Sequence, residues 1–297
     1  MIRPGARSAA GAALLAALAS CVAPPAPPPP SLPPQPAPPP RVLPPAGRIL
    51  LSGTPGQGAL VPGTAPSGTA RLTLDGVVVP VARNGRFVIA FDRDAPAAAT
   101  LVATLVDGRT VSLPLGVPPR TWRIERLDRV AKVPVPSADF ARRRPAELAR
   151  IAAARRIESV ADGWRQRFVW PVTGRISGLF GSQRIYRGEP GSYHSGVDVA
   201  RPTGTPVVAP ADGVVTLAAD APFTLEGNLL LIDHGMGLNS AFLHLSRIDV
   251  AVGARVRQGE QIGAIGATGR VSGPHLHWAM KWRDARIDPM LVAGAMN

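Results

Sequence analysis

Cysteine is almost absent from this chain of 297 residues, in which Cys21 is the only one. A single cysteine cannot form an internal disulfide, so any exported form of the protein must be stable without one. The residue also lies at the end of an amino-terminal apolar stretch, away from the other reactive motifs. A thiol nucleophile is therefore not expected, and no Gly-x-Ser-x-Gly elbow offers a catalytic serine in its place.

Lysine and aromatic residues are scarce as well. Only 2 of the 33 basic residues are lysine, the aromatic fraction is 5%, and the formal net charge is +13. Arginine clusters in residues 129–166, at Arg142-Arg143-Arg144 and Arg155-Arg156, without an aromatic stacking platform. Nucleic acid is therefore not an expected partner. A solvated helix face is the favoured interpretation, with anionic wall polymer or lipid headgroups as alternatives.

The amino-terminal apolar run, residues 9–19, is shorter than the roughly 20 residues that span a bilayer. Arg3 and Arg7 precede it, and its end reads Leu18-Ala19-Ser20-Cys21, which resembles a bacterial lipobox. Residues 1–21 are therefore predicted to be a lipoprotein signal peptide that ends at Cys21, the lipidated residue. The mature protein would be exported and held to a membrane by this anchor, facing the periplasm.

Proline, in contrast, is abundant: the chain has 34, and they dominate residues 22–45. Such a segment cannot pack a core and favours polyproline II, which at about 3.1 Å per residue gives a spacer of roughly 70 Å. A linker that lifts the folded protein from the membrane is the favoured interpretation. A ligand for a proline-binding module is the alternative.

Residues 46–128 are predicted to form a small all-β domain. Asp75-Gly76, Asn84-Gly85 and Asp107-Gly108 are dipeptides typical of hairpin turns, with alternating apolar residues between them. Seven or so short strands at this spacing indicate an immunoglobulin-like sandwich or a similar β-fold. The segment contains no motif with evident chemistry.

The pattern changes twice more along the chain. Residues 129–166 read as a basic helical connector, in which Pro145 is typical of a first helical turn and apolar residues continue to Ile157, before Gly163. In residues 167–297, short apolar runs alternate with Gly-rich turns. That pattern predicts an antiparallel β domain rather than βαβ units, so the fold class is mainly β.

Histidine occurs only five times, and three of the five lie in His194-Ser195-Gly196-Val197-Asp198 and His275-Leu276-His277. Side chains two or four residues apart share one face of a strand, so each motif can present its polar groups together. Imidazole and carboxylate are the donors of a catalytic zinc site with an open position. His244 ends a further apolar run, whereas His234 lies in an Asp-His-Gly turn and is interpreted as a structural residue.

With these motifs, about residues 167–290 resemble the lysostaphin/LytM-type zinc metallopeptidases (metallopeptidase family 23), which cut peptide cross-links in peptidoglycan. The resemblance implies the duplicated hybrid motif of that family, an antiparallel β-sheet with zinc at the floor of a groove. Besides the histidine motifs, it rests on Thr205-Pro206-Val207, Ala209-Pro210, Asp212-Gly213, Gly227-Asn228, Ile232-Asp233-His234-Gly235, His244-Leu245-Ser246, Val256, Gly259, Ile262-Gly263, Gly266 and Thr268-Gly269.

Carried over to this sequence, the resemblance implies that His194, Asp198 and His277 bind Zn²⁺. His275 would be the general base that takes a proton from metal-activated water. His244 would be a second catalytic imidazole, which polarises the substrate or stabilises the transition state.

The resemblance also indicates substrate-binding residues. Asn228 is one, and either Tyr186 or Tyr193 would supply the transition-state tyrosine that the family places before its first ligand. Many members have a tyrosine two residues before the histidine that corresponds to His244. This chain has Phe242 there, so that hydroxyl is missing.

The sequence thus predicts an exported, lipid-anchored zinc endopeptidase that acts on peptidoglycan. The expected bond is the D-Ala–diaminopimelate cross-link of a two-membrane envelope. The alternative is a non-enzymatic envelope lipoprotein that activates or recruits a wall amidase. An activator has no need of His194, Asp198, His275 and His277 together, which favours the enzyme.

Overall fold

The computed structural model describes residues 45–129 and 137–296. The predicted signal peptide, Cys21 and nearly all of the proline-rich segment lie outside the described residues. The described residues all fall within one compact unit. Among the described residues, no helix combines the length and the apolar character needed to cross a bilayer.

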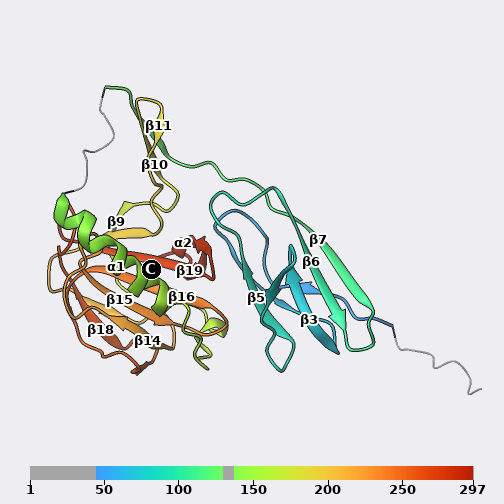
Figure 1. The fold of residues 1–297 in the computed structure, drawn as a ribbon. Helices are drawn as coiled ribbons and strands as arrows, with labels where there is room; N and C mark the ends of the chain where they lie inside the picture. The colour runs from blue at the N-terminus through green and yellow to red at the C-terminus, as the bar shows by residue number, and fades with distance from the viewer. Residues whose placement is uncertain (1–44, 130–136, 297) are drawn as a thin grey trace, which may run out of the picture. The chain divides into compact units, whose positions relative to one another are not determined.

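Two antiparallel sheets form residues 45–117, here called the N-terminal β region (Figure 1). One sheet has the strand order β1-β2-β5 and the other β4-β3-β6-β7. Val61 and Phe87 of the first sheet and Leu72 and Leu101 of the second are buried, so both sheets contribute to the core. The strands are β1 (Leu50–Leu51), β2 (Leu60–Thr64), β3 (Thr69–Leu74), β4 (Val77–Val79), β5 (Arg86–Ala90), β6 (Ala98–Leu105) and β7 (Thr110–Gly116).

The three predicted hairpin dipeptides all occupy turns in this region. Asp75 and Gly76 have φ angles of 47° and 83°, the left-handed pair that a two-residue hairpin needs between β3 and β4. Gly85 and Gly108 also have positive φ angles, 79° and 86°. The hairpin predictions are confirmed for Asp75-Gly76, between the paired strands β3 and β4, and for Asp107-Gly108, between β6 and β7. The turn at Asn84-Gly85 is not a hairpin, because the strands on either side of it, β4 and β5, belong to different sheets.

Strand β8 (Ile124–Leu127) pairs outside the 46–128 segment to which the sequence assigned it. It runs parallel to β10 (Gln183–Tyr186), with Ile124 opposite Gln183 and Leu127 opposite Tyr186. On its other side, β10 pairs with β11 (Glu189–Pro190). The sequence gave no sign of this pairing, because the partner strands are far apart in the chain and local periodicity does not reveal partners.

Helix α1 (Ala138–Arg155) begins earlier than predicted, so the assignment of Pro145 to its first turn was wrong. Ser137 caps the helix, and its Oγ accepts the backbone N–H of Phe140 at 3.2 Å. Pro145 lies inside the helix, where it removes one helical hydrogen bond. The cap and the contacts of α1 with the sheet below it outweigh that cost.

A ten-stranded sheet carries α1 and forms most of residues 175–287 (Figure 1). Its main path is β17-β14-β15-β16-β19-β12-β9, with β13, β18 and β20 paired at its sides. All pairs between these strands are antiparallel, as predicted. The strands are β9 (Arg175–Gly178), β12 (Val197–Ala200), β13 (Pro206–Val208), β14 (Gly213–Ala218), β15 (Asn228–Asp233), β16 (Leu238–Ile248), β17 (Arg255–Val256), β18 (Gln261–Ile265), β19 (Leu276–Trp282) and β20 (Ala285–Ile287).

The two faces of this sheet have different roles. Leu276, Trp278 and Met280 alternate along β19 and are buried in the main core. Ala279 is buried in a smaller apolar cluster together with Ala154 of α1, so α1 covers part of the opposite face. His277 alternates in the same way as Ala279 and lies on that face. Two short helical segments complete the described chain: η1 (Gly163–Arg165) and α2 (Pro289–Ala293).

Candidate metal centre

Strands β12 and β19 bring two of the predicted ligands side by side. Asp198 and His277 are directly opposite each other in the register of these strands. The Nδ1 atom of His277 lies 2.9 Å from Oδ1 of Asp198. His194, in the loop before β12, places its Nε2 atom 3.1 Å from that oxygen and 3.0 Å from Nδ1 of His277. Three donor atoms from the predicted residues therefore converge on one point.

The orientation of His194 is set by its second ring nitrogen. Its Nδ1 atom lies 3.1 Å from the carbonyl oxygen of Leu179. A carbonyl can only accept, so the ring proton belongs on Nδ1 and the Nε2 lone pair faces the other two donors. Metal-binding histidines commonly show this arrangement.

Two glycines leave the space that the donor groups need. A Cβ atom on Gly178 in β9 would lie 2.2 Å from Oδ2 of Asp198 and 3.0 Å from Cε1 of His194. A Cβ atom on Gly196 would lie 2.8 Å from Nε2 of His277. Gly196 belongs to the first histidine motif, whereas Gly178 was missed by the sequence reasoning. A glycine inside a strand, which often marks a close approach, was its only signal.

His275 and His244 stand beside this cluster. The Nδ1 atom of His275 lies 2.8 Å from the carbonyl oxygen of Gly273, and its Nε2 lies 3.7 Å from Oδ1 of Asp198. The Nδ1 atom of His244 lies 2.9 Å from the carbonyl oxygen of Thr268. The centre of the His244 ring is 5.0 Å from that of His275. Both imidazoles are therefore held by a backbone carbonyl.

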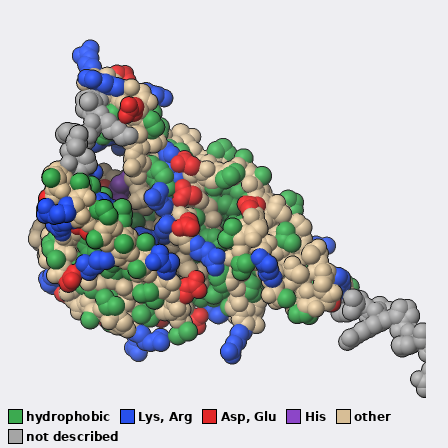
Figure 2. Space-filling view, in the orientation of Figure 1, with side chains coloured by type: hydrophobic (Ala, Val, Ile, Leu, Met, Phe, Trp, Pro, Cys, Tyr) green, Lys and Arg blue, Asp and Glu red, His purple; other side chains and the backbone are tan. Residues whose placement is uncertain are grey.

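The cluster is half-buried, and its charges are strongly coupled. Burial alone would raise the pKa of Asp198, but hydrogen bonds from His194 and His277 bring it well below its usual range. Burial lowers the pKa of His277, and it lowers the pKa of His244 to about 4. The side chains of His194 and Asp198 remain 24% and 19% exposed, so solvent reaches part of both. Figure 2 shows histidine, in purple, at the surface in this view.

His234 lies apart from these groups and is buried. Its Nδ1 atom is 2.8 Å from the carbonyl oxygen of Asp212, and its Nε2 is 2.9 Å from Oγ of Ser240. Burial lowers its pKa to about 4, so the ring is neutral. These contacts fit the structural interpretation made from the sequence. Phe242 is also buried, in the main core.

The predicted substrate-binding residues make contacts of their own. The Nδ2 atom of Asn228 donates to the carbonyl oxygen of Leu245 at 2.9 Å. The hydroxyl of Tyr193 donates to Oδ1 of Asp92 at 2.8 Å. Burial raises the pKa of Tyr193 to about 12. Tyr186 ends strand β10. A role for these three residues in substrate binding stays a prediction.

Comparison with known proteins finds relatives of the part of the chain that contains this cluster. Residues 192–289 match the model of peptidase family M23. The chain is 37% identical over 147 residues to the cell division protein DipM of Caulobacter vibrioides, covering 48% of this chain and 23% of that protein. It is 40% identical over 129 residues to the peptidoglycan DD-endopeptidase ShyA of Vibrio cholerae, covering 42% of this chain and 29% of the relative.

A solved structure matches more of the chain. A Pseudomonas aeruginosa protein assigned to peptidase M23 is 29% identical, with a TM-score of 0.63, and covers 82% of this chain and 97% of its own. The curated relatives, in contrast, are far longer than the region they share, since the chain spans only 23% and 29% of the first two. The candidate metal ligands and both neighbouring imidazoles all fall within the matched residues 192–289. Residues 192–289 therefore form a domain of the peptidase family M23 type, the lysostaphin/LytM-type metallopeptidases.

Proposed function

We propose that this protein is a zinc-dependent endopeptidase that cleaves peptide cross-links of peptidoglycan. The observation that carries the proposal is the convergence of Nε2 of His194, Oδ1 of Asp198 and Nδ1 of His277, 2.9 to 3.1 Å apart. The relative ShyA is named a peptidoglycan DD-endopeptidase, which supports the same reaction class.

The donor set fits zinc. Two imidazole nitrogens and one carboxylate oxygen are typical of catalytic zinc sites, which keep a further position open. Their compact arrangement, with solvent access, suits one small cation. Zinc bound there supplies Lewis-acid chemistry that polarises a carbonyl and acidifies water.

His275 is proposed as the general base. Because its Nδ1–H is held by the carbonyl of Gly273, its Nε2 presents a lone pair toward the donor cluster. That nitrogen can accept a proton from the attacking water and later return it to the leaving amine. His244 is held in the same way by Thr268, so its neutral ring also presents an acceptor at Nε2. An acceptor at this position can orient a water molecule but cannot donate a hydrogen bond to an oxyanion. The contact with Thr268 therefore favours the first role for His244.

The finer parts of the proposal come from the sequence. The lipobox at Cys21 and the proline-rich linker of residues 22–45 support a lipoprotein that faces the periplasm. In that compartment the expected substrate is the D-Ala–diaminopimelate cross-link. The alternative, a non-enzymatic activator of an amidase, does not require four converging polar side chains and is therefore not favoured.

Digestion of purified sacculi tests the activity. A protein of residues 46–297 should release uncross-linked muropeptides whose masses identify the bond cut, and a chelator should stop the release. Asp198→Ala removes one of three donors and should abolish both tight zinc binding and hydrolysis. Undigested sacculi in the presence of excess zinc, or full activity of Asp198→Ala, would contradict the proposal.

A further inference from the structure

The position of His194 depends on the backbone of residues 179–182. The carbonyl of His194 accepts the N–H of Gly181 at 2.8 Å, and the N–H of His194 donates to the carbonyl of Ser182 at 2.8 Å. The imidazole itself contacts the carbonyl of Leu179. Any displacement of this backbone therefore moves the His194 ring, and with it the Nε2 atom that faces Asp198.

Arg93 of the N-terminal β region holds that same backbone. Its Nε donates to the carbonyl of Gly181 at 2.9 Å, and its Nη2 donates to Oε1 of Gln183 at 3.1 Å. The side chain is only 7% exposed, and its third contact is an ion pair with Asp94 at 2.6 Å. The guanidinium lies 4.9 Å from the centre of the Tyr193 ring. One buried arginine thus contacts both the backbone that supports His194 and the residue before it.

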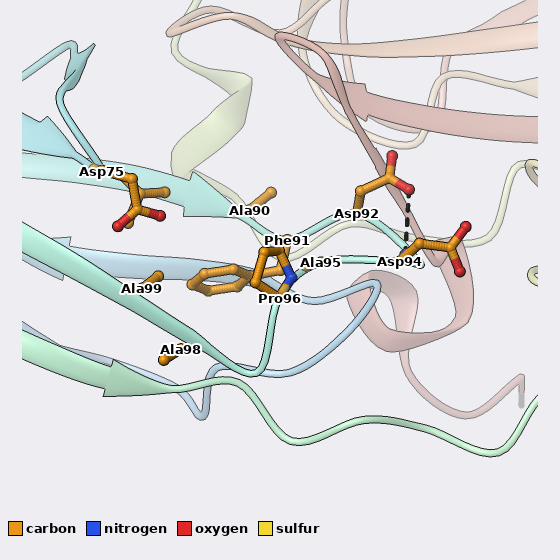
Figure 3. Close-up of a pocket in the computed structure, with 10 residues that line it drawn as sticks. Asp75, Ala90, Phe91, Asp92, Asp94, Ala95, Pro96, Ala98 and Ala99 are labelled. Atoms are coloured by element: carbon orange, nitrogen blue, oxygen red, sulfur yellow. Dashed lines mark hydrogen bonds between the residues drawn. The ribbon is translucent and has the colours of Figure 1, made fainter.

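Asp92 makes a second contact with the same loop. Its Oδ1 accepts the hydroxyl of Tyr193 at 2.8 Å, and its Oδ2 accepts the backbone N–H of Arg286 at 2.8 Å. Nη1 of Arg286 donates to the Tyr193 hydroxyl at 3.2 Å, which closes the network. Asp92 and Asp94 line a pocket of about 330 Å³. Figure 3 shows the hydrogen bond that the backbone N–H of Asp94 donates to the Asp92 carboxylate.

The segment after the N-terminal β region adds apolar support. Trp122 lies so close to Gly181, whose φ is +79°, that a Cβ there would be 2.1 Å from its ring. The Trp122 ring also packs edge-on against Phe180, with centres 5.8 Å apart. Two residues on, β8 pairs with β10. The chain segment before β12 is therefore packed against Trp122 and β8, which lie outside residues 192–289.

We propose that Arg93 and Asp92 are positioning residues for the metal centre, and that the N-terminal β region fixes His194 through them. The inference rests on the proposed zinc-dependent function. It assigns this region a role in forming the site, although none of its side chains reaches the three donor atoms. Residues that orient a ligand without touching the metal typically contribute tenfold or more to its affinity, up to about a hundredfold.

The chemistry of Arg93 makes the inference specific. Its planar guanidinium donates in three directions at once, to Gly181, Gln183 and Asp94. Lysine carries the same charge but cannot reproduce that planar geometry. Arg93→Lys should therefore recover only part of what Arg93→Ala loses. If only the positive charge mattered, Arg93→Lys would recover everything that Arg93→Ala loses.

The test measures zinc affinity of the chain from residue 46 to 297 by competition with a chromophoric chelator. Arg93→Ala should raise the zinc dissociation constant about tenfold or more. Its hydrolysis at limiting zinc should fall and then recover as zinc is added. Arg109→Ala is the matched control, because Arg109 pairs with Asp107 in the exposed β6–β7 turn of the same region. Thermal unfolding of the metal-free proteins checks that each variant is folded.

An unchanged zinc dissociation constant in folded Arg93→Ala would overturn the inference while leaving the proposed function intact. Absence of zinc binding by the wild-type protein would overturn both. If Arg93→Ala does not fold, Asp92→Ala and Tyr193→Phe replace it, since both act at the edge of the network. Each should raise the zinc dissociation constant. The double variant should raise it no further than the single variant with the larger effect. Unchanged zinc affinity in both single variants, or effects that add fully in the double variant, would contradict the proposal that Asp92 and Tyr193 act together on the metal centre.

Discussion

At the scale of single residues, backbone carbonyls decide what three of the four imidazoles at the centre can do. Leu179, Gly273 and Thr268 each place a carbonyl oxygen within 3.1 Å of one ring nitrogen of a histidine at the centre. Each contact fixes the ring and assigns its proton, so the opposite nitrogen is left as an acceptor. The donor cluster is thereby organised by main chain as much as by side chains.

The general base can be tested separately from metal binding. His275→Ala should retain about one zinc per chain, because His275 is not among the three converging donors. Its turnover should fall at least roughly a hundredfold, the usual contribution of a positioned acid–base group. Metal content and sacculus digestion are measured on the same preparation. Normal turnover with normal zinc would transfer the role to another group, with His244 first in line.

The space at Gly178 gives a second test at this scale. In Gly178→Ala the new Cβ would collide with Oδ2 of Asp198, so the carboxylate must leave its place. We expect zinc affinity to fall at least about tenfold. Gly116→Ala is the control, because a Cβ at Gly116 meets nothing within 4 Å. Equal zinc affinity in the two variants would show that the observed position of Asp198 is not required.

The donor residues could be predicted from the sequence, and their surroundings could not. His194, Asp198, His275 and His277 stand in two motifs whose spacing on strands already indicates one face. The carbonyl of Leu179 has no signature in side-chain identity. Contacts made by main chain, or across long sequence separations, leave no local pattern.

At the scale of elements, α1 is fixed to the loop before β15 by a largely buried ion pair and two hydrogen bonds. Nη1 and Nη2 of Arg144 donate to the two carboxylate oxygens of Glu226, at 2.6 and 2.8 Å. Glu147 accepts the backbone N–H and the hydroxyl of Thr224, at 2.8 and 2.5 Å. The sequence favoured a solvated helix face for this arginine cluster, with an anionic polymer as an alternative partner. Arg144 instead attaches the helix to the rest of the protein.

Loss of Arg144 should destabilise the fold. Arg144→Met leaves the Glu226 carboxylate, 12% exposed, without its bidentate partner. The free energy of unfolding, measured by urea denaturation, should fall by about 2 kcal/mol. Arg142→Met is the matched control on the same helix, because its partner Asp139 is 53% exposed and exposed pairs contribute less than about 1 kcal/mol. Equal losses in the two variants would refute the role given to Arg144.

Local signals explain which elements could be predicted. The turn at Asp75-Gly76 follows from the positive φ angles that these residues tolerate, and it formed as predicted. Pro145 misled the helix prediction, because a preference for the first turn does not forbid an interior position when other contacts compensate. The β8–β10 pairing depends on tertiary contacts alone.

At the scale of the whole molecule, the proposal joins an anchor, a linker and an enzyme. Cys21 ends the lipobox-like run, and proline-rich residues 22–45 follow it directly. A single acyl chain binds a bilayer only marginally, so stable anchoring requires the several chains that bacterial lipoproteins carry. A linker of roughly 70 Å would then let a membrane-bound enzyme reach the wall.

Replacing Cys21 tests this arrangement directly. Cys21→Ala removes the thiol that lipidation needs, so the protein should remain unprocessed or appear in the soluble periplasmic fraction. Membrane fractionation and the mass of the mature amino terminus distinguish these results, with Ser20→Ala as a control that keeps the thiol. Because the peptidase residues lie far along the chain, the purified soluble form should still digest sacculi. Wild-type protein that is soluble and begins at another residue would replace the lipoprotein by a secreted enzyme, and leave the chemistry of the metal centre unchanged.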